Sequence, residues 1–135
     1  MKTVFVDTNV FLRFLTGDDL RQREKAVALF KKAAAGEISL LSGPPVFFEI
    51  AWSMRTVYGQ KNEVILEFLT SMLRLPGLRI TDITVVEKAI GLAKNRGMDF
   101  ADAYVAALAG SEGATELATF NRKHFEGVLD LYPLE

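Results

Sequence analysis

The chain has 135 residues, of which half are hydrophobic and 24% are charged, and its formal net charge is −1. These values fit an ordinary globular domain and argue against a generally basic nucleic-acid-binding protein. With no cysteine and one histidine, His124, the chain lacks the residues for a disulfide, a thiolate nucleophile, a cysteine-bound zinc ion or a multi-histidine metal site. Any catalysis must therefore depend on carboxylates, hydroxyls, lysine, arginine or tyrosine.

The hydrophobic segments are all short. The apolar run of residues 4–6 ends at Asp7, which is too short for a secretory signal. No stretch approaches the roughly 18 apolar residues of a membrane span. We therefore expect a cytoplasmic protein, with residues 1–135 forming a single domain.

Short apolar segments alternate with amphipathic ones along the chain, beginning with a predicted strand at residues 3–6. Helices are predicted at 20–35, 42–58, 63–75, 84–96 and 99–110, and further strands at 38–41, 78–80, 116–119 and 129–131. Asp19 and Gln22 form a predicted capping box for the first of these helices. The alternation predicts an α/β fold with a parallel sheet between helices. Functional residues of such folds lie where strands end, as Asp7 and Asn121 do here.

Three carboxylates stand in apolar surroundings. Asp7 directly follows the first strand, Glu49 lies within the apolar segment 46–52, and Asp102 lies within the apolar helix of residues 100–109. This pattern predicts that all three are buried. A buried, unpaired carboxylate is unfavourable, so each would need a cation or several hydrogen-bond donors.

Each carboxylate also has a separate structural explanation. Asp7 could cap the next helix, Glu49 could pair with Arg55, and Asp102 could interact with its helix dipole. One shared Mg²⁺ ion explains all three together, because it prefers oxygen ligands. Asp99, one helical turn before Asp102, could join them or simply cap the helix. Without a histidine pair, metal-bound carboxylates suit phosphodiester hydrolysis.

Four segments, taken in order, resemble a PIN domain, and in particular the VapC-type toxins of bacterial and archaeal toxin–antitoxin pairs. They are residues 5–10, Glu49, residues 99–103 and residues 118–121. The resemblance extends over residues 4–125. It implies a three-layer, Rossmann-like fold with a central parallel sheet of four or five strands. It also implies an endoribonuclease that depends on Mg²⁺ or Mn²⁺.

The resemblance also implies roles for individual residues. Asp7 and Asp102 would be the main metal ligands and Glu49 would complete the acidic cluster. Thr8 or Asn9 would hydrogen-bond around Asp7, and Thr119 would lie beside the metal.

The chain departs from the family pattern at Asn121, where the family usually has a fourth acidic residue. Asparagine keeps an oxygen ligand but loses a negative charge, which Asp99 could supply. The resulting hypothesis is one firmly bound ion and a second ion that binds only with substrate.

The resemblance implies three partners: RNA, a small antitoxin that masks the site, and a second copy of the chain. Arg13, Arg122 and Lys123 are the candidate RNA contacts, although solvated surface charge is the alternative for each. The helix of residues 63–75 and the apolar side chains near residues 11–15 offer faces for an antitoxin, although core packing is the commoner use of such faces.

Two other readings compete with a nuclease. Haloacid-dehalogenase-like phosphatases also place an aspartate after a strand, but they need an acid two residues later, where this chain has Asn9. A PIN domain that has lost activity and serves as a binding module would explain Asn121 and the slightly acidic net charge.

Overall fold

The computed structural model describes residues 1–134, and the chain divides into two compact units, Met1–Ile83 and Thr84–Glu135. The first unit is built on three parallel strands, β1 (Thr3–Phe5), β2 (Ser39–Ser42) and β3 (Leu78–Ile80). They pair in the order β1-β2-β3, with Leu40 opposite both Val4 and Leu78. Leu40 is fully buried, so the middle strand lies in the core of this unit.

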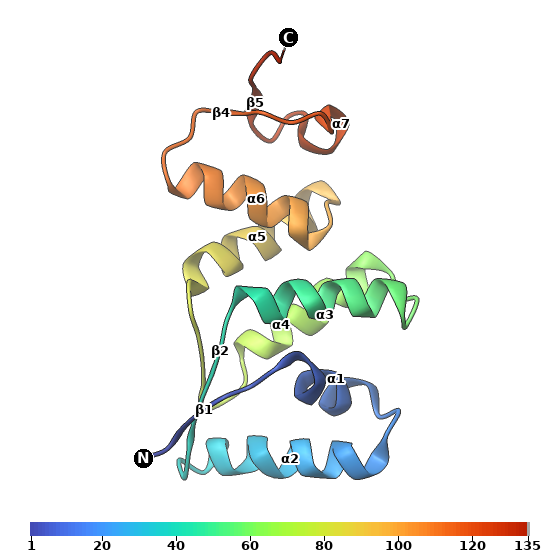
Figure 1. Cartoon of the computed structure of the whole chain (residues 1–135), viewed down its shortest axis with the longest axis vertical. Helices are drawn as coiled ribbons and strands as arrows, with labels where there is room; N and C mark the ends of the chain where they lie inside the picture. Colours follow the sequence, from blue (N-terminus) through green and yellow to red (C-terminus); the bar gives the residue numbers. More distant parts are fainter. Residues whose placement is uncertain (135) are drawn as a thin grey trace. The chain divides into compact units, whose positions relative to one another are not determined.

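Four helices complete the first unit: α1 (Thr8–Thr16), α2 (Leu20–Ala34), α3 (Pro44–Thr56) and α4 (Asn62–Leu73). They pack in the sequence α2, α1, α3, α4, so α1 contacts both α2 and α3 (Figure 1). Each helix buries one apolar face, and the fully buried side chains include Phe11, Phe47, Ile50, Leu69 and Met72. This packing carries the N-terminus of α1 to the side of α3.

The predicted start of α2 at Asp19 is confirmed, but only half of the predicted capping box forms, because Oε1 of Gln22 accepts from Nε of Arg13 instead. The Asp19 carboxylate accepts a hydrogen bond from the backbone N–H of Gln22 at 3.0 Å. The preceding turn requires glycine, because Gly17 ends α1 at a φ of 68°. A second glycine, Gly77, also has a positive φ, and a Cβ there would lie 2.6 Å from the Ala33 carbonyl oxygen. Only glycine therefore lets the chain enter β3 against the end of α2.

The second unit contains α5 (Ile83–Arg96, which begins at the last residue of the first unit), α6 (Phe100–Ser111) and α7 (Arg122–Phe125). Two short strands, β4 (Glu116–Leu117) and β5 (Asp130–Leu131), form a parallel pair. The buried side chains of this unit include Val86, Ala89, Ala93, Phe100 and Ala103. Helix α5 begins one residue before the predicted start at Thr84.

The predicted α/β class is confirmed, and every predicted strand and helix has a counterpart. The prediction of one central sheet of four or five strands is corrected: within residues 1–134 the strands form a three-stranded sheet and a separate two-stranded sheet. Strand pairing joins residues that are far apart in the chain, so local apolar patterns do not specify which strands are neighbours. A single domain over residues 1–135 stays a prediction. Within the described residues, no helix is long and apolar enough to cross a membrane.

Candidate active site

Asp7 lies between β1 and α1, where the chain changes from strand to helix. It is the N-cap residue of α1, in extended conformation, and its Oδ1 accepts a 2.7 Å hydrogen bond from the Thr8 backbone N–H. The capping role predicted as the structural alternative is therefore present. It uses one carboxylate oxygen, and Oδ2 has no hydrogen-bond donor among residues 1–134. Capping thus leaves an oxygen of Asp7 able to bind a cation.

Thr8 connects Asp7 to a residue on another helix. Its side chain is buried, and its Oγ1 donates a 2.7 Å hydrogen bond to Oε2 of Glu49 on α3. Thr8 therefore hydrogen-bonds to two carboxylates that are 42 positions apart in sequence. Its backbone N–H donates to Asp7 and its hydroxyl donates to Glu49. We call Asp7, Thr8 and Glu49 the Thr8 cluster.

The prediction that Asp7 and Glu49 are buried is wrong, because both are exposed. Helix α3 buries only one face, which includes Phe47 and Ile50, whereas Glu49 lies outside that face. Even the large apolar side chain of Trp52 is 58% exposed on α3. The apolar sequence of α3 therefore overstated its burial, and Glu49 keeps contact with water.

The second unit holds another pair of carboxylates at the start of α6. Asp99 is the N-cap, and its Oδ1 accepts a 2.9 Å hydrogen bond from the backbone N–H of Asp102 in the first turn. The side chain of Asp102 is 27% exposed, so it too is only partly buried. The two carboxylates share one end of one helix, as their spacing predicted.

His124 contacts Asp102, which the sequence did not predict. Its Nδ1 lies 3.0 Å from Oδ2 of Asp102, and this contact joins α7 to α6. The signal in the sequence was weak: His124 is the only histidine of the chain and lies three residues after the family position at Asn121. We call Asp99, Asp102 and His124 the α6–α7 cluster.

The α6–α7 cluster lines a hollow of about 350 Å³ within the second unit. Its lining residues are Arg96, Gly97, Met98, Asp99, Asp102, Lys123 and His124. The predicted RNA contact Lys123 therefore shares this hollow with both carboxylates, whereas Arg122 is exposed and is not among the lining residues. Nearby, the backbone N–H of Asn121 donates to Oγ1 of Thr119 at 3.0 Å, so these two predicted site residues form a turn before α7.

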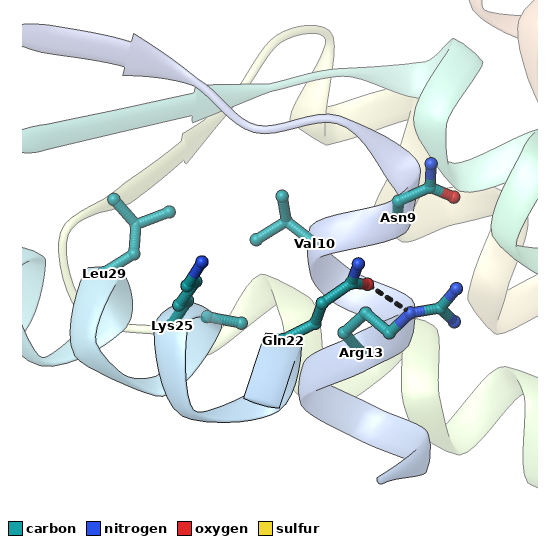
Figure 2. Close-up of a pocket in the computed structure, with 7 residues that line it drawn as sticks. Asn9, Val10, Arg13, Gln22, Lys25 and Leu29 are labelled. Carbon is teal, nitrogen blue, oxygen red and sulfur yellow. Dashed lines mark hydrogen bonds between the residues drawn. The ribbon is translucent and has the colours of Figure 1, made fainter. Parts of the chain in front are cut away.

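A different hollow lies within the first unit, between α1 and α2 (Figure 2). Its volume is about 360 Å³. It is lined by Asn9, Val10, Arg13, Gln22, Lys25, Ala26 and Leu29, so the predicted site residue Asn9 belongs to its wall. Asn9 and Val10 lie in the first turn of α1, which Asp7 caps.

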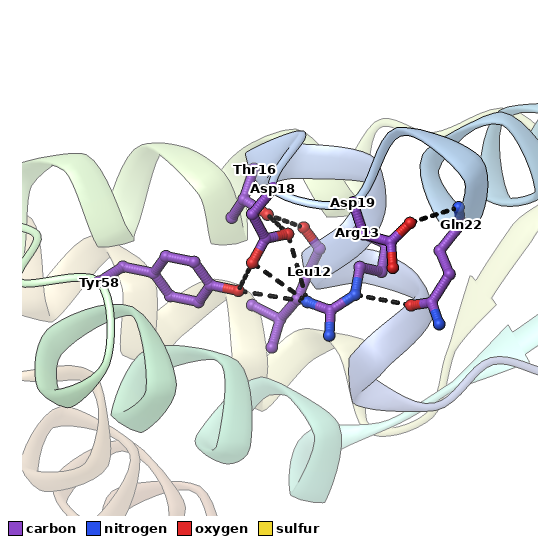
Figure 3. Close-up of polar contacts among 7 residues, drawn as sticks. All are labelled: Leu12, Arg13, Thr16, Asp18, Asp19, Gln22 and Tyr58. Carbon is purple, nitrogen blue, oxygen red and sulfur yellow. Dashed lines mark hydrogen bonds and ion pairs between the residues drawn. The ribbon is translucent and has the colours of Figure 1, made fainter.

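Arg13 is held by a polar cluster (Figure 3). Its Nε donates to Oε1 of Gln22 at 2.7 Å. Its Nη1 lies 3.3 Å from each of the two Asp18 carboxylate oxygens and 3.3 Å from the Tyr58 hydroxyl. Hydrogen bonds from Tyr58 and Thr16, together with the charge of Arg13, hold the pKa of Asp18 below its ordinary value of 3.8. Much of the charge of Arg13, a predicted RNA contact, is therefore matched inside the first unit.

The donors in both clusters suit a hard divalent cation. The Thr8 cluster offers two carboxylates and the α6–α7 cluster offers two more, all of them oxygen ligands of the kind that Mg²⁺ and Mn²⁺ prefer. In the part of the chain that the structure describes, no three histidine, aspartate or glutamate side chains are grouped closely enough to hold a metal by themselves. Each cluster alone thus supplies part of a coordination shell.

The model of one protein family, the PIN domain, matches residues 4–128. This chain belongs to the PIN domain family. PIN domains are generally nucleases and typically use divalent metals. The match covers both compact units, including the Thr8 cluster and the α6–α7 cluster.

Two solved structures of low sequence identity are similar to this PIN domain chain over nearly its full length. A chain from the structure of VapBC2 from Rickettsia felis bound to a promoter DNA fragment is 18% identical, covers 100% of both chains and has a TM-score of 0.38. A chain from a toxin–antitoxin complex of Klebsiella pneumoniae is 19% identical, covers 98% of this chain and 97% of its own, and has a TM-score of 0.36. Among curated proteins, none matches the sequence. The family assignment rests on the PIN domain match.

Proposed function

We propose that this chain is a Mg²⁺- or Mn²⁺-dependent endoribonuclease and the VapC-type toxin of a toxin–antitoxin pair. The observation that carries the proposal is the Thr8 cluster, in which Thr8 holds Glu49 beside Asp7, at the positions where the PIN resemblance places acidic residues. PIN family membership supports nuclease chemistry, and the all-oxygen donor set supports a divalent metal.

In this proposal Asp7 and Asp102 are the main metal ligands, Glu49 completes the acidic cluster and Asp99 supplies further negative charge. A divalent ion held by these carboxylates would supply activation of water and stabilisation of negative charge on the attacked phosphate. The protein orients the ligands: α1 presents Asp7 at its N-terminus, and Thr8 holds Glu49. Lys123 lines the same hollow as Asp102, and in this proposal it binds a substrate phosphate.

The remaining partners belong to the same proposal. They are RNA as substrate, a small antitoxin that covers the carboxylates, and a second copy of the chain in a homodimer, all in the cytoplasm. Arg122 and Arg13 stay candidate RNA contacts, although the Asp18 carboxylate already partners Arg13. Asn9 still argues against an aspartyl-phosphate route, because an amide cannot act as the second acid.

The test is an RNA cleavage assay on the whole chain with Mg²⁺, Mn²⁺ or EDTA. We expect wild type to cut RNA only with metal, and the Asp102→Asn and Glu49→Gln variants to lose cleavage. Glu24→Gln, a matched change at an exposed glutamate of α2, should cut like wild type. Equal cleavage by Asp102→Asn would indicate a contaminating nuclease and would overturn the assignment.

The second candidate is a PIN domain that binds RNA or protein without cutting. Asn121 favours it, because the usual acidic residue is absent there. No cleavage across total RNA from several sources, combined with retained RNA binding, would support this candidate. Where cleavage does occur, sequencing the RNA ends after induced expression would identify the substrate and the cut site.

A further inference from the structure

The hollow between α1 and α2, which we call the α1–α2 pocket, combines apolar walls with basic and amide groups. Val10, Ala26 and Leu29 form the apolar part, whereas Arg13, Lys25, Asn9 and Gln22 supply polar atoms. No carboxylate is among the lining residues, although acidic residues outnumber basic ones in the chain, 17 to 16. Its volume of about 360 Å³ lies at the small end of the range of roughly 300–1,000 Å³ for ligand sites.

The polar atoms of the α1–α2 pocket differ in how far they are already engaged. Gln22 accepts from Arg13 through Oε1, which leaves its Nε2 as a donor. Neither the Asn9 amide nor the Lys25 ammonium has a hydrogen-bond or ion-pair partner among residues 1–134, and both side chains are exposed. Figure 2 shows Val10 on α1 pointing toward the α2 residues Lys25 and Leu29, whereas the Asn9 amide points away from them. The Gln22 amide and the Lys25 ammonium are thus the polar groups available to a ligand in the pocket.

The α1–α2 pocket includes residues of the first turn of α1, the turn that Asp7 caps. Asn9 and Val10 lie in the helical turn that Asp7 caps, and the backbone N–H of Val10 donates to the Asp7 carbonyl oxygen at 3.2 Å. A ligand in this pocket therefore lies along the same turn of α1 as the Asp7 carboxylate.

We propose that the α1–α2 pocket binds one unpaired nucleobase of the RNA substrate, next to the phosphodiester bond that is cut. This proposal rests on the proposed nuclease function. Aliphatic side chains can pack against the face of a base, and a glutamine amide such as that of Gln22 can hydrogen-bond to its edge. Lys25 then pairs with a neighbouring phosphate. Proteins that read RNA sequence mostly bind splayed, unstacked bases in this manner, so the pocket would set base preference at one position.

The first experiment measures binding without catalysis. Methyl chemical shifts of Val10 and Leu29 are followed by NMR in metal-free buffer while each of the four nucleoside 5′-monophosphates is added to the whole chain. We expect at least one nucleotide to shift both residues, and ribose 5-phosphate, which lacks the base, to shift neither. Equal shifts with ribose 5-phosphate, or no shift at these methyls with any nucleotide, would overturn the proposal. A parallel titration uses an apolar peptide. If the peptide shifts these methyl signals and no nucleotide does, the proposal is also overturned.

Matched variants then test the role of Lys25. Lys25→Met should weaken nucleotide binding by about two- to fivefold, the range for one exposed ion pair. Lys31→Met removes an exposed lysine of the same helix that is not among the residues lining the pocket, and it should bind like wild type. Equal weakening by both variants would mean that general positive charge is responsible and would contradict a built site.

The second experiment uses cleavage. A substrate RNA carries a single abasic residue, moved one position at a time around the cut site. We expect one position at which loss of the base slows wild type about tenfold or more, with no further slowing in Leu29→Trp, whose side chain fills the pocket. If every abasic substrate slows both proteins equally, the base binds elsewhere. RNA cleavage that persists alongside failed nucleotide binding overturns this proposal alone. Absence of cleavage with intact nucleotide binding overturns the proposed nuclease and, with it, the placement of the base next to a cut bond, and leaves only a base-binding pocket.

Discussion

The hydroxyl of Thr8 on α1 donates a 2.7 Å hydrogen bond to the carboxylate of Glu49 on α3. Thr8 is 5% exposed whereas Glu49 is exposed, so a buried donor holds a carboxylate that remains in contact with water. The same threonine donates its backbone N–H to Asp7. The orientation of both carboxylates thus depends on one residue that is not itself acidic.

Thr8→Val tests this dependence, because it keeps the shape of the side chain and removes the hydroxyl. We expect a loss of about 0.5–1.5 kcal/mol in the free energy of unfolding, as for one intramolecular hydrogen bond. We also expect Mn²⁺ affinity to fall about 10-fold, as for loss of an outer-shell partner. Urea denaturation and Mn²⁺ titration measure the two effects. Thr8→Ser, which keeps the hydroxyl, should restore most of both, and its failure to do so would point to packing instead.

Asp7 has two roles that substitution can separate. Asn is as good an N-cap as Asp, so Asp7→Asn should leave the free energy of unfolding within about 0.5 kcal/mol of wild type. Asp7→Ala removes the cap as well and should cost about 1 kcal/mol. Both should lose cleavage by more than the roughly 10–100-fold that an outer-shell change causes. Cleavage retained in Asp7→Asn would contradict a metal-ligand role.

The contact of His124 with Asp102 occupies the oxygen Oδ2, at 3.0 Å. If Asp102 is a metal ligand, this contact competes with the cation for that oxygen. His124→Ala should then strengthen Mn²⁺ binding by about two- to fivefold, as for the loss of one partly exposed polar contact. Calorimetry in one buffer measures the change, with Asp102→Asn as the variant that should not bind. Weaker Mn²⁺ binding by His124→Ala would show instead that the histidine orients the ligand.

Asn121 is the position where this chain lacks the usual family carboxylate, and it lies at the start of α7. We expect calorimetry of wild type to show one firm Mn²⁺ site, with a second only when RNA is present. Asn121→Asp should strengthen the second site about tenfold, or about 1.4 kcal/mol, within the range for unit charges about 4 Å apart near a surface. Two tight and equal sites in wild type would refute the hypothesis of a weakened second site.

The polar cluster around Asp18 predicts a pH effect on stability. Its pKa is lowered in the folded chain, first by the Tyr58 hydrogen bond and then by Thr16 and Arg13. Folding therefore favours the ionised form of Asp18. The resulting contribution to the free energy of unfolding is present above pH 3.8. It is lost as the pH falls below that value and through the lowered pKa. The free energy of unfolding, measured from pH 6 to pH 2.5, should depend less on pH in Asp18→Asn. Tyr58→Phe should reduce the dependence in the same direction, and an unchanged profile in both variants would contradict this role.

Much of the fold could be predicted because the signals are local. The spacing of apolar residues predicted α2 to α6 but missed α1 and α7, and Asp19 with Gln22 predicted the start of α2 where the structure has it. Family motifs at Asp7, Glu49 and Asp102 identified the candidate site, and the PIN domain match covers all three. The apolar pattern failed at the burial of Glu49, because a helix can be apolar on two faces and bury only one.

The sequence by itself therefore determined the α/β class, most of the elements in their order and the PIN family, and it supplied the candidate carboxylates, because propensity, periodicity and motif order are local properties of short segments. Only the tertiary structure decided that Thr8 holds Glu49, that His124 contacts Asp102, and that a hollow lies between α1 and α2. These relationships depend on how the helices pack. Packing brings together residues that are far apart in the chain, and their separation in sequence does not reveal that they are close in space.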